Sequence, residues 1–373
     1  MKTGYKVAKG LLLGVVLFAF SSVTALAQID DVSSILQAGK TDANILVQEY
    51  LKPYGRGLGS SLNSGWTNTA RPHKTLGLDI TISAGLAVVP DADAAFNVAQ
   101  LDLTRLQYEN GPLISPTIAG DKTSGSVLAA YVDPDMPESK FLEFTMPKGT
   151  GFQYAPAPMI KAGLGLFKGT EVMVRYLPQY EVNDFGSFEL WGVGLKHDIK
   201  QWLPGGKLIP VDLSVMFGYT YMDLSSDFSL TAEQVITNAD LTDNPYAGNP
   251  EIWAGQGVTL NTEAYTINAL VGKTLPVISI YGGVGYEAST FSIKTPGVYP
   301  TVIPNQAFEN DPGNNNPFIV DAVEEPISVE IDGKNGLHAL AGFRFRFAIF
   351  HISGSYKLAN YSTYNLGFGI SFR

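Results

Sequence analysis

The chain has 373 residues and a formal net charge of −10, and only 16% of its residues are charged, against roughly 25% in a typical soluble domain. The acidic excess argues against a nucleic-acid partner. The absence of cysteine excludes disulfides, thiol catalysis and cysteine-based metal sites. Hydrophobic residues reach 45%, yet beyond residue 27 no apolar run approaches the ~18–20 residues of a membrane-spanning helix.

Residues 1–27 are typical of a cleavable secretory signal. A basic stretch comes first, an apolar core follows over 11–20, and Ala25-Leu26-Ala27 forms a small-x-small cleavage site. The basic residues are Lys2, Lys6 and Lys9. We expect an exported mature chain that starts at Gln28, with an uncleaved anchor helix as the alternative.

Residues 28–72 differ from the rest of the chain, because their apolar side chains recur at helical steps of three and four. Thr41 or Asp42 could cap this helix, Pro53 should kink it, and the glycines after Pro53 weaken it. We expect a short helical segment that plugs a lumen or lies at its periplasmic mouth. The apolar stripe consists of Val47, Leu51, Tyr54, Leu58 and Leu62.

From about residue 76 the hydrophobic period changes to two, which is typical of β-strands. The strands run to roughly ten residues or more, where soluble strands average five or six. Their non-apolar face is rich in glycine, serine and asparagine, as in the wall of a lumen. The predicted strands are approximately 76–89, 96–108, 127–146, 157–167, 170–181, 186–198, 208–224, 257–273, 276–294, 336–347, 349–359 and 362–372.

These features favour an all-β fold, a transmembrane antiparallel barrel of about twelve strands over residues 73–373, with ten to fourteen strands left open. Turns at Lys168-Gly169, 274–276 and Ala348 are short and should be periplasmic, whereas 225–256 and 295–335 are long and should face outwards. Aromatic residues that suit interfacial girdles are Tyr176, Trp191, Tyr219, Tyr221, Tyr265, Tyr286, Tyr356 and Tyr364.

The segment 54–66, with Arg71-Pro72-His73-Lys74 and the first strand, resembles the front of a family of uncharacterised outer-membrane barrels of Gram-negative bacteria. The last strand is similar to the C-terminal assembly signal of such barrels, except that Arg373 follows the final aromatic, Phe372. The helix, long loops and barrel also resemble FadL-type fatty-acid channels, whose N-terminal segment plugs the lumen. Those channels have fourteen strands, so this second likeness is one of architecture alone and implies hydrophobic transport only by analogy.

Motifs for chemistry are weak. Gly55-Arg56-Gly57-Leu58-Gly59 does not follow a strand and open a helix, as a phosphate-binding loop must, and close backbone approach or a flexible plug explains it better. The four histidines share no metal-ligand spacing, so we expect no metal and no cofactor. His351-Ile352-Ser353 resembles the His-x-Ser pair of outer-membrane phospholipase A, but its alternation places His351 and Ser353 in the lumen rather than against lipid.

Charges on the strands should face the lumen, because each would cost ~2–4 kcal/mol on the lipid face near the bilayer midplane. Internal pairing is one interpretation of these charges and a selectivity lining is the other. Four basic residues on the last strands, Arg344, Arg346, His351 and Lys357, could together hold an anion or Asp30, Asp31 and Glu49 of the plug. The lining candidates are Arg344, Arg346, His351, Lys357, Arg175, Asp79, Asp212 and Glu287.

The sequence thus predicts an outer-membrane barrel in contact with lipid, and a passive channel for a small hydrophobic or amphipathic solute. A structural or assembly role with envelope protein partners is the main alternative. A lipid-modifying enzyme is a second alternative, although we expect no enzymatic activity.

Overall fold

The computed structural model describes residues 35, 39–131, 140–181, 186–235, 245–246, 249–305 and 318–372. The predicted signal peptide, the start at Gln28 and the acidic residues Asp30 and Asp31 lie outside the described residues. No helix in the described part of the chain is long and apolar enough to cross a membrane.

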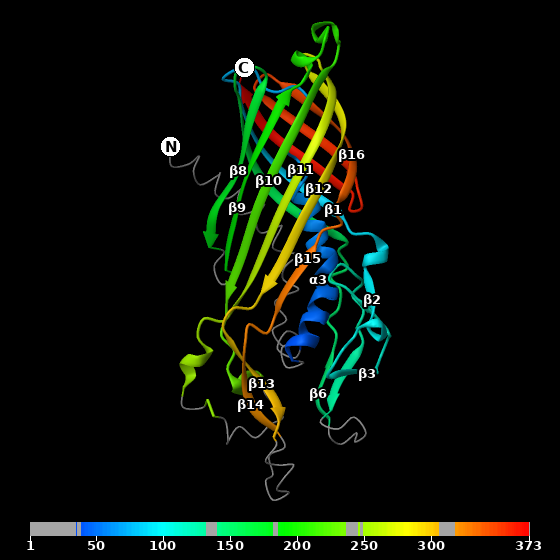
Figure 1. The fold of residues 1–373 in the computed structure, drawn as a ribbon, viewed down its shortest axis with the longest axis vertical. Coiled ribbons are helices and arrows are strands. Elements are labelled where there is room, and N and C mark those ends of the chain that lie inside the picture. Colours follow the sequence, from blue (N-terminus) through cyan, green and yellow to red (C-terminus); the bar gives the residue numbers. More distant parts are fainter. Residues whose placement is uncertain are drawn as a thin grey trace, which may run out of the picture.

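Ten antiparallel strands close into a barrel, seen side-on in Figure 1. Around the ring the order is β11, β10, β9, β8, β7, β1, β18, β17, β16 and β12, and β12 pairs again with β11. The first and last of these strands pair from Leu78 opposite Phe372 to Ala87 opposite Thr363. The strands are β1 Leu78–Val88, β7 Tyr154–Gly165, β8 Thr170–Glu181, β9 Ser187–Asp198, β10 Asp212–Asp227, β11 Gly257–Thr274, β12 Ile278–Lys294, β16 Gly336–Phe347, β17 Phe350–Leu358 and β18 Thr363–Phe372.

The closed antiparallel barrel with a helical segment before it is confirmed, but the count of about twelve strands is not. The predicted strands 96–108 and 127–146 lie outside the ring in two small sheets. One sheet pairs β2 Ala95–Asn97 with β4 Ile114–Pro116, and the other joins β3 Leu106–Asn110, β5 Val127–Tyr131 and β6 Lys140–Thr145. These strands are too short to span the wall, and their apolar side chains, such as Leu128 and Leu142, are buried in a core at one end of the barrel.

The barrel has a short-turn end and a long-loop end. The connections 166–169, 275–277 and 348–349 lie at the first, together with the start of β1 and the end of β18. Lys168 and Gly169 both have positive φ, at 55° and 64°, as a tight hairpin turn requires. The long-loop end carries the small sheets, the hairpin of β13 Val298–Pro304 and β14 Phe318–Glu324, and β15 Ser328–Asp332, which pairs with the far end of β12 (Figure 1).

The wall is least complete between β7 and β8, which pair only from Lys161–Arg175 to Gly165–Glu171. The N–H of Gly165 donates to the carbonyl of Gly77, just before β1, and the N–H of Val89, just after β1, donates to the carbonyl of Gln153. The odd-numbered residues of β7 therefore form their backbone hydrogen bonds with β1. Even-numbered residues therefore face β8, and Pro156 and Pro158 bring no N–H donor to that edge. The prolines account for the early end of this pairing.

Outward side chains change character along the barrel. On β10, Val215 and Phe217 point outwards near the short-turn end, whereas Asp223 and Ser225 occupy the same face near the long-loop end. We call the two parts the short-turn tier and the long-loop tier, which meet on β10 after Tyr221. The exposed apolar side chains of the short-turn tier include Ile80, Ile82, Leu164, Val172, Val174, Val193, Leu195, Ile267, Val271, Ile280, Val284, Phe343, Phe345, Ile352, Leu366 and Phe368.

Inward side chains change in the opposite sense. On β10, Ser214 and Thr220 line the short-turn tier, and Met222 and Leu224 line the long-loop tier. β11 and β12 repeat this inversion, and β12 ends with Phe291 and Ile293 buried in the core of the long-loop tier. The short-turn tier is therefore apolar outside and mainly polar inside, apart from an apolar cluster in which Met173, Met216 and Leu270 surround Trp66, and the long-loop tier is polar outside and mainly apolar inside.

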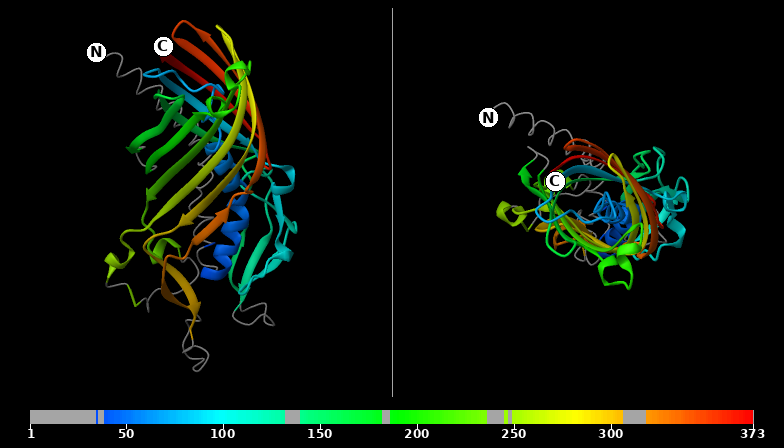
Figure 2. Two further views of the ribbon diagram at one scale, coloured as in Figure 1. Left: turned by 45° about the horizontal axis from the view of Figure 1, so that its top comes forward. Right: turned by 90° about the horizontal axis from the view of Figure 1, so that it is seen from above.

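Helix α3, Lys40–Leu62, lies inside the barrel, where it contacts β1, β7, β11, β12 and β15 (Figure 2, right). It enters from the long-loop end and runs towards the middle of the lumen (Figure 1). The residues of the predicted apolar stripe lie on its packing face, with Tyr54 partly buried and the others buried. This helix packs well because the long-loop tier offers it an apolar interior.

The start and the far half of α3 differ from expectation. The N-cap is Gly39, not Thr41 or Asp42. The Asp42 carboxylate is buried and accepts from the backbone N–H groups of Thr104, Arg105 and Leu106, which fixes the helix to the loop before β3. The helix continues through Pro53 to Leu62.

The glycine run gives the helix room against the wall. A Cβ on Gly57 would lie 2.7 Å from the Cβ of Ala155, and one on Gly59 would lie 2.0 Å from Ser289 Oγ. The glycines are therefore close-approach positions, one of the two explanations that the sequence favoured over nucleotide binding.

Candidate functional site

After Leu62 the chain crosses the rest of the lumen as an irregular segment, 63–75, and reaches the short-turn end where β1 begins (Figure 1). We call residues 40–75 the plug. Wall side chains bind the plug chiefly through its backbone carbonyls. In each pair the wall side chain donates and the plug carbonyl accepts: Lys357 to Ser60 (2.8 Å), Arg175 to Leu62 (2.5 Å) and to Ser64, Lys161 to Trp66 (2.8 Å), Tyr281 to Thr67 (2.9 Å), Lys196 to Thr69 (3.2 Å) and Ser214 to Ala70 (2.7 Å).

Two of these donors sit at the C-terminus of α3. The last carbonyls of a helix have no partner within it and carry the negative end of the helix dipole. Lys357 binds the carbonyl of Ser60, and Arg175 binds that of Leu62. Both side chains are buried in the lumen, so the positive charges and the carbonyls interact with little screening by bulk solvent.

Trp66 occupies the centre of the short-turn tier, with only 1% of its surface exposed. The Arg175 guanidinium lies 3.8 Å from the centroid of its ring, a cation–π distance. On the wall, a Cβ on Gly218 would lie 2.5 Å from the indole and one on Gly194 would lie 2.7 Å from it. Because these two glycines have no side chain, they leave the space that Trp66 occupies. The hydrophobic periodicity of the sequence does not report such a contact between distant residues.

Asp79 anchors the first of three ionic clusters. Arg344 Nη2 lies 2.9 Å from Asp79 Oδ2, and His351 Nδ1 and His73 Nε2 lie 3.6 Å and 3.7 Å from the same oxygen. Thr81 also donates to Asp79 at 2.7 Å. The predicted lining residues Asp79, Arg344 and His351 are thus together and paired with each other.

Two further carboxylates hold the other clusters. Lys196 Nζ lies 2.9 Å from Glu171, whose other oxygen lies 3.1 Å from His73 Nδ1. Lys357 forms an ion pair with Glu287, and Ser60 of the plug donates to the same carboxylate at 3.1 Å. Lys357 therefore belongs to a different cluster from Arg344, and the predicted grouping of the four basic residues is divided.

The remaining predicted residues lie at the short-turn mouth. Arg346 is exposed there, and no hydrogen bond or ion pair of its side chain occurs among the described residues. Asp212 lies 3.5 Å from Arg71 and accepts from Thr274. Of the acidic plug residues expected to pair with the wall, Glu49 instead pairs with Lys52 on its own helix at 2.7 Å, and Asp30 and Asp31 lie outside the described residues.

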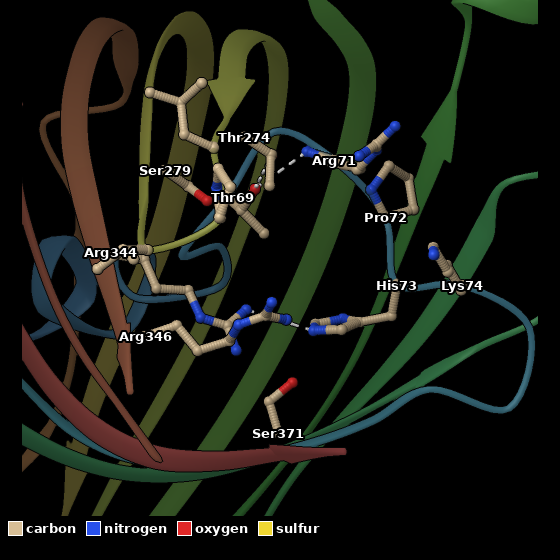
Figure 3. Close-up of a pocket in the computed structure, with 13 residues that line it drawn as sticks. Thr69, Arg71, Pro72, His73, Lys74, Thr274, Ser279, Arg344, Arg346 and Ser371 are labelled. Atoms are coloured by element: carbon tan, nitrogen blue, oxygen red, sulfur yellow. Dashed lines mark hydrogen bonds between the residues drawn. The ribbon is translucent and has the colours of Figure 1, made fainter. Parts of the chain in front are cut away.

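A cavity of about 370 Å³ opens at this mouth. Figure 3 shows Arg344 and Arg346 from the wall pointing into it alongside His73 of the plug. Arg344 Nη1 lies 3.4 Å from His73 Nε2. The other lining residues are Thr69, Arg71, Pro72, Lys74, Thr274, Leu275, Pro276, Val277, Ser279 and Ser371.

His351 and Ser353 are both buried on the lumen side of β17, as the sequence predicted. The ring of His351 contacts Thr81 at 3.2 Å and Arg344 at 3.2 Å. These contacts fix the ring in the Asp79 cluster. Within the described ranges no group of three or more histidine, cysteine, aspartate or glutamate residues has metal-binding geometry.

Among solved structures, the chain is similar to Ail of Yersinia pestis (10% identity, 79% of this chain and 98% of that one, TM-score 0.24). It is also similar to the translocator domain of the autotransporter NalP from Neisseria meningitidis (10% identity, 81% and 90%, TM-score 0.25) and to the toluene transporter TodX of Pseudomonas putida (7% identity, 85% and 96%, TM-score 0.23). A search of curated proteins gives no match. The model of the family of unknown function DUF6588 matches residues 6–372, and the chain belongs to that family.

Proposed function

We propose that the protein is an outer-membrane β-barrel whose short-turn tier lies in the bilayer, with the short turns in the periplasm. The exposed apolar side chains of β18 run from Tyr364 to Phe372, which matches the roughly 9–11 residues of a strand that crosses a bilayer. An apolar band around a whole barrel far exceeds the few hundred Å² that soluble proteins expose in one patch. Export by the predicted signal peptide, with a mature start at Gln28, would deliver the chain there.

A row of aromatic side chains supports the same placement. Tyr176, Trp191 and Tyr221 are cross-strand neighbours on β8, β9 and β10. The Trp191 ring centroid lies 5.5 Å from that of Tyr219 and 5.8 Å from that of Tyr221. The row lies where the outward face changes from apolar to polar, and amphipathic rings prefer that depth in a membrane.

Within this barrel we propose a passive route for a small hydrophobic or amphipathic solute, which opens when residues 63–75 move. The observation that carries this proposal is that a separate segment, bound through its carbonyls, fills the lumen. The wall behind it is lined by small residues such as Gly194, Ser214 and Gly218. Eight strands already enclose an interior that side chains just fill, and this wall has ten. It would therefore leave an open space if the segment moved, although longer side chains such as Arg175, Lys196 and Met216 also point inwards.

A disulfide between plug and wall tests this. Thr69 Oγ1, within the segment 63–75, lies 3.4 Å from Thr274 Oγ1 of β11, and the chain has no native cysteine. We expect the oxidised Thr69→Cys/Thr274→Cys variant in liposomes to lose solute flux to the level of empty liposomes, and reduction to restore it.

The matched control is Ser187→Cys/Ser225→Cys, which joins β9 to β10 where the hydroxyls are 2.8 Å apart and does not touch the plug. Its flux should not depend on oxidation. Equal flux in the oxidised and reduced plug-to-wall variant would contradict a moving plug, and a wild-type protein without flux for any solute would contradict transport.

A structural role in an envelope complex is the second candidate, with protein partners at the long-loop end. The small sheets and the β13–β14 hairpin favour it, because they extend beyond the barrel where a partner could reach them (Figure 1). We propose no catalytic role for either candidate. His351→Ala should leave lipid hydrolysis by the purified protein at background.

A further inference from the structure

The cavity at the short-turn mouth has the composition of an anion site. Arg71, Lys74, Arg344 and Arg346 line it, and no aspartate or glutamate is among its lining residues. Internal carboxylates account for only part of this charge. Arg344 pairs with Asp79, and Arg71 lies 3.5 Å from Asp212.

The remaining donors have no partner in the described part of the chain. Arg346 and Lys74 take part in no hydrogen bond or ion pair of their side chains there. Arg344 is only 6% exposed, and its Nε is a buried donor without an acceptor. A buried donor without a partner is costly, and an anion in the cavity would supply the acceptor.

The size and the walls of the cavity restrict the ligand further. A volume of about 370 Å³ lies in the range of pockets for small organic ligands and is much larger than an inorganic anion needs. Pro72, Leu275, Pro276 and Val277 form an apolar part of the lining, and Ser279 and Ser371 add hydroxyl donors.

We propose that the mouth cavity binds a compact amphipathic anion, a carboxylate or phosphate carried on a small apolar group. The guanidinium groups of Arg344 and Arg346 would hold the acidic group, because the planar fork of arginine binds carboxylate and phosphate oxygens in pairs. The apolar part would lie against the proline and leucine wall. As an account of what passes through the barrel, this rests on the proposed function, but binding itself is independent of transport.

Titration of the detergent-solubilised full-length protein with phenyl phosphate, benzoate and neutral benzyl alcohol tests the site. We expect saturable binding of both anions and none of the alcohol. Arg346→Gln should weaken phenyl phosphate binding about tenfold, as expected for the loss of a charge-assisted hydrogen bond, and Arg346→Lys should weaken it less. Lys294→Gln makes the same charge change on an exposed side chain at the long-loop end, and it should leave binding unchanged.

The anion can come from a free solute or from a lipid headgroup. In nanodiscs, displacement of phenyl phosphate by phosphatidylglycerol but not by phosphatidylcholine would identify a headgroup, and no displacement would identify a free solute; the site stands in both cases. Absence of saturable anion binding, or equal binding by Arg346→Gln and wild type, would overturn the proposal. If anions bind but never cross the bilayer in the liposome assay, they are not the solute that passes through the barrel, while the site remains.

Discussion

The short-turn and long-loop tiers are built from the same strands but have opposite insides and outsides. On β11, Ile267 points outwards in the first tier and Thr259 does so in the second, while Thr266 and Leu260 point inwards at the corresponding levels. An alternation of period two therefore does not say which face is wet. The medium around each tier decides which face is apolar, and one strand can face lipid near one end and water near the other.

The largest effect should come from the interior of the long-loop tier. Phe291 is buried against Gly55 of α3. Phe291→Ala should cost about 3–5 kcal/mol, because the ring leaves a cavity between helix and wall. Thr266→Ala, an inward change in the short-turn tier, should cost about 1–2 kcal/mol, because its hydroxyl donates to the carbonyl of Tyr286 and accepts from Asn268.

Urea-dependent folding into lipid vesicles would measure both free energies of unfolding. Equal losses in the two variants would mean that the interiors of the tiers are not different in kind, which would contradict the inversion.

The next effect concerns the outer face. Ile267→Lys places a charge at a position that we assign to lipid, so it should cost about 2–4 kcal/mol. Thr259→Lys places the same charge farther along the same face of β11, where we expect water, and should change stability by less than about 0.5 kcal/mol.

The same vesicle titration would compare the two, with the heat-modifiable gel shift as a check that both variants fold. A tolerated lysine at residue 267 would remove the main support for the membrane placement of the short-turn tier.

The sequence predicted the closed barrel, the inward charges and the apolar stripe of α3, because periods of two and of three to four depend on local backbone geometry. It did not predict the number of strands in the ring. It assigned 96–108 and 127–146 to the wall, although the second is irregular, yet their described strands β2, β3, β5 and β6 lie beyond the ring at its long-loop end and share a core with α3. Whether a segment joins the wall depends on which distant strands it pairs with, and the hydrophobic period of the segment itself carries no information on those partners.

The candidate site shows the same limit. The charge on Arg175, Arg344 and Lys357 was readable, whereas their partners were not. Plug carbonyls accept from Arg175 and Lys357, and every residue has a carbonyl, so no residue type in the plug marks these contacts. Trp66 was missed for a related reason, since its fit depends on glycines of two distant strands.

A smaller effect should follow from the anchor of α3 in the long-loop tier. The Asp42 carboxylate accepts from three backbone N–H groups and from Thr104 Oγ1 at 2.8–2.9 Å. Asp42→Asn keeps the shape of the side chain but turns one acceptor towards the donors as an NH₂, so it should cost about 1.5–3 kcal/mol. Hydrogen exchange should accelerate in the first turns of α3 and at 104–106, and not in 63–75. Faster exchange throughout the plug would mean that the tiers hold it as one unit.

The smallest effect is a pH dependence at the long-loop end. Asp93 accepts from Tyr361 at 2.6 Å and lies 3.0 Å from Lys334 Nζ. Burial alone would raise the pKa of the Asp93 carboxyl, but the hydrogen bonds from Tyr361 and Lys334 outweigh it and hold that pKa below its ordinary value of 3.8. Because the folded state lowers this pKa, the contact stabilises the fold fully above the ordinary value and loses its contribution as the pH falls through the lower, folded value. Tyr361→Phe should therefore cost about 1 kcal/mol at neutral pH, the value of one hydrogen bond, and the difference from wild type should shrink in acid. The carboxyl chemical shift of Asp93 should titrate at a lower pH in wild type than in the variant, and a difference between the two that grew in acid would contradict this assignment.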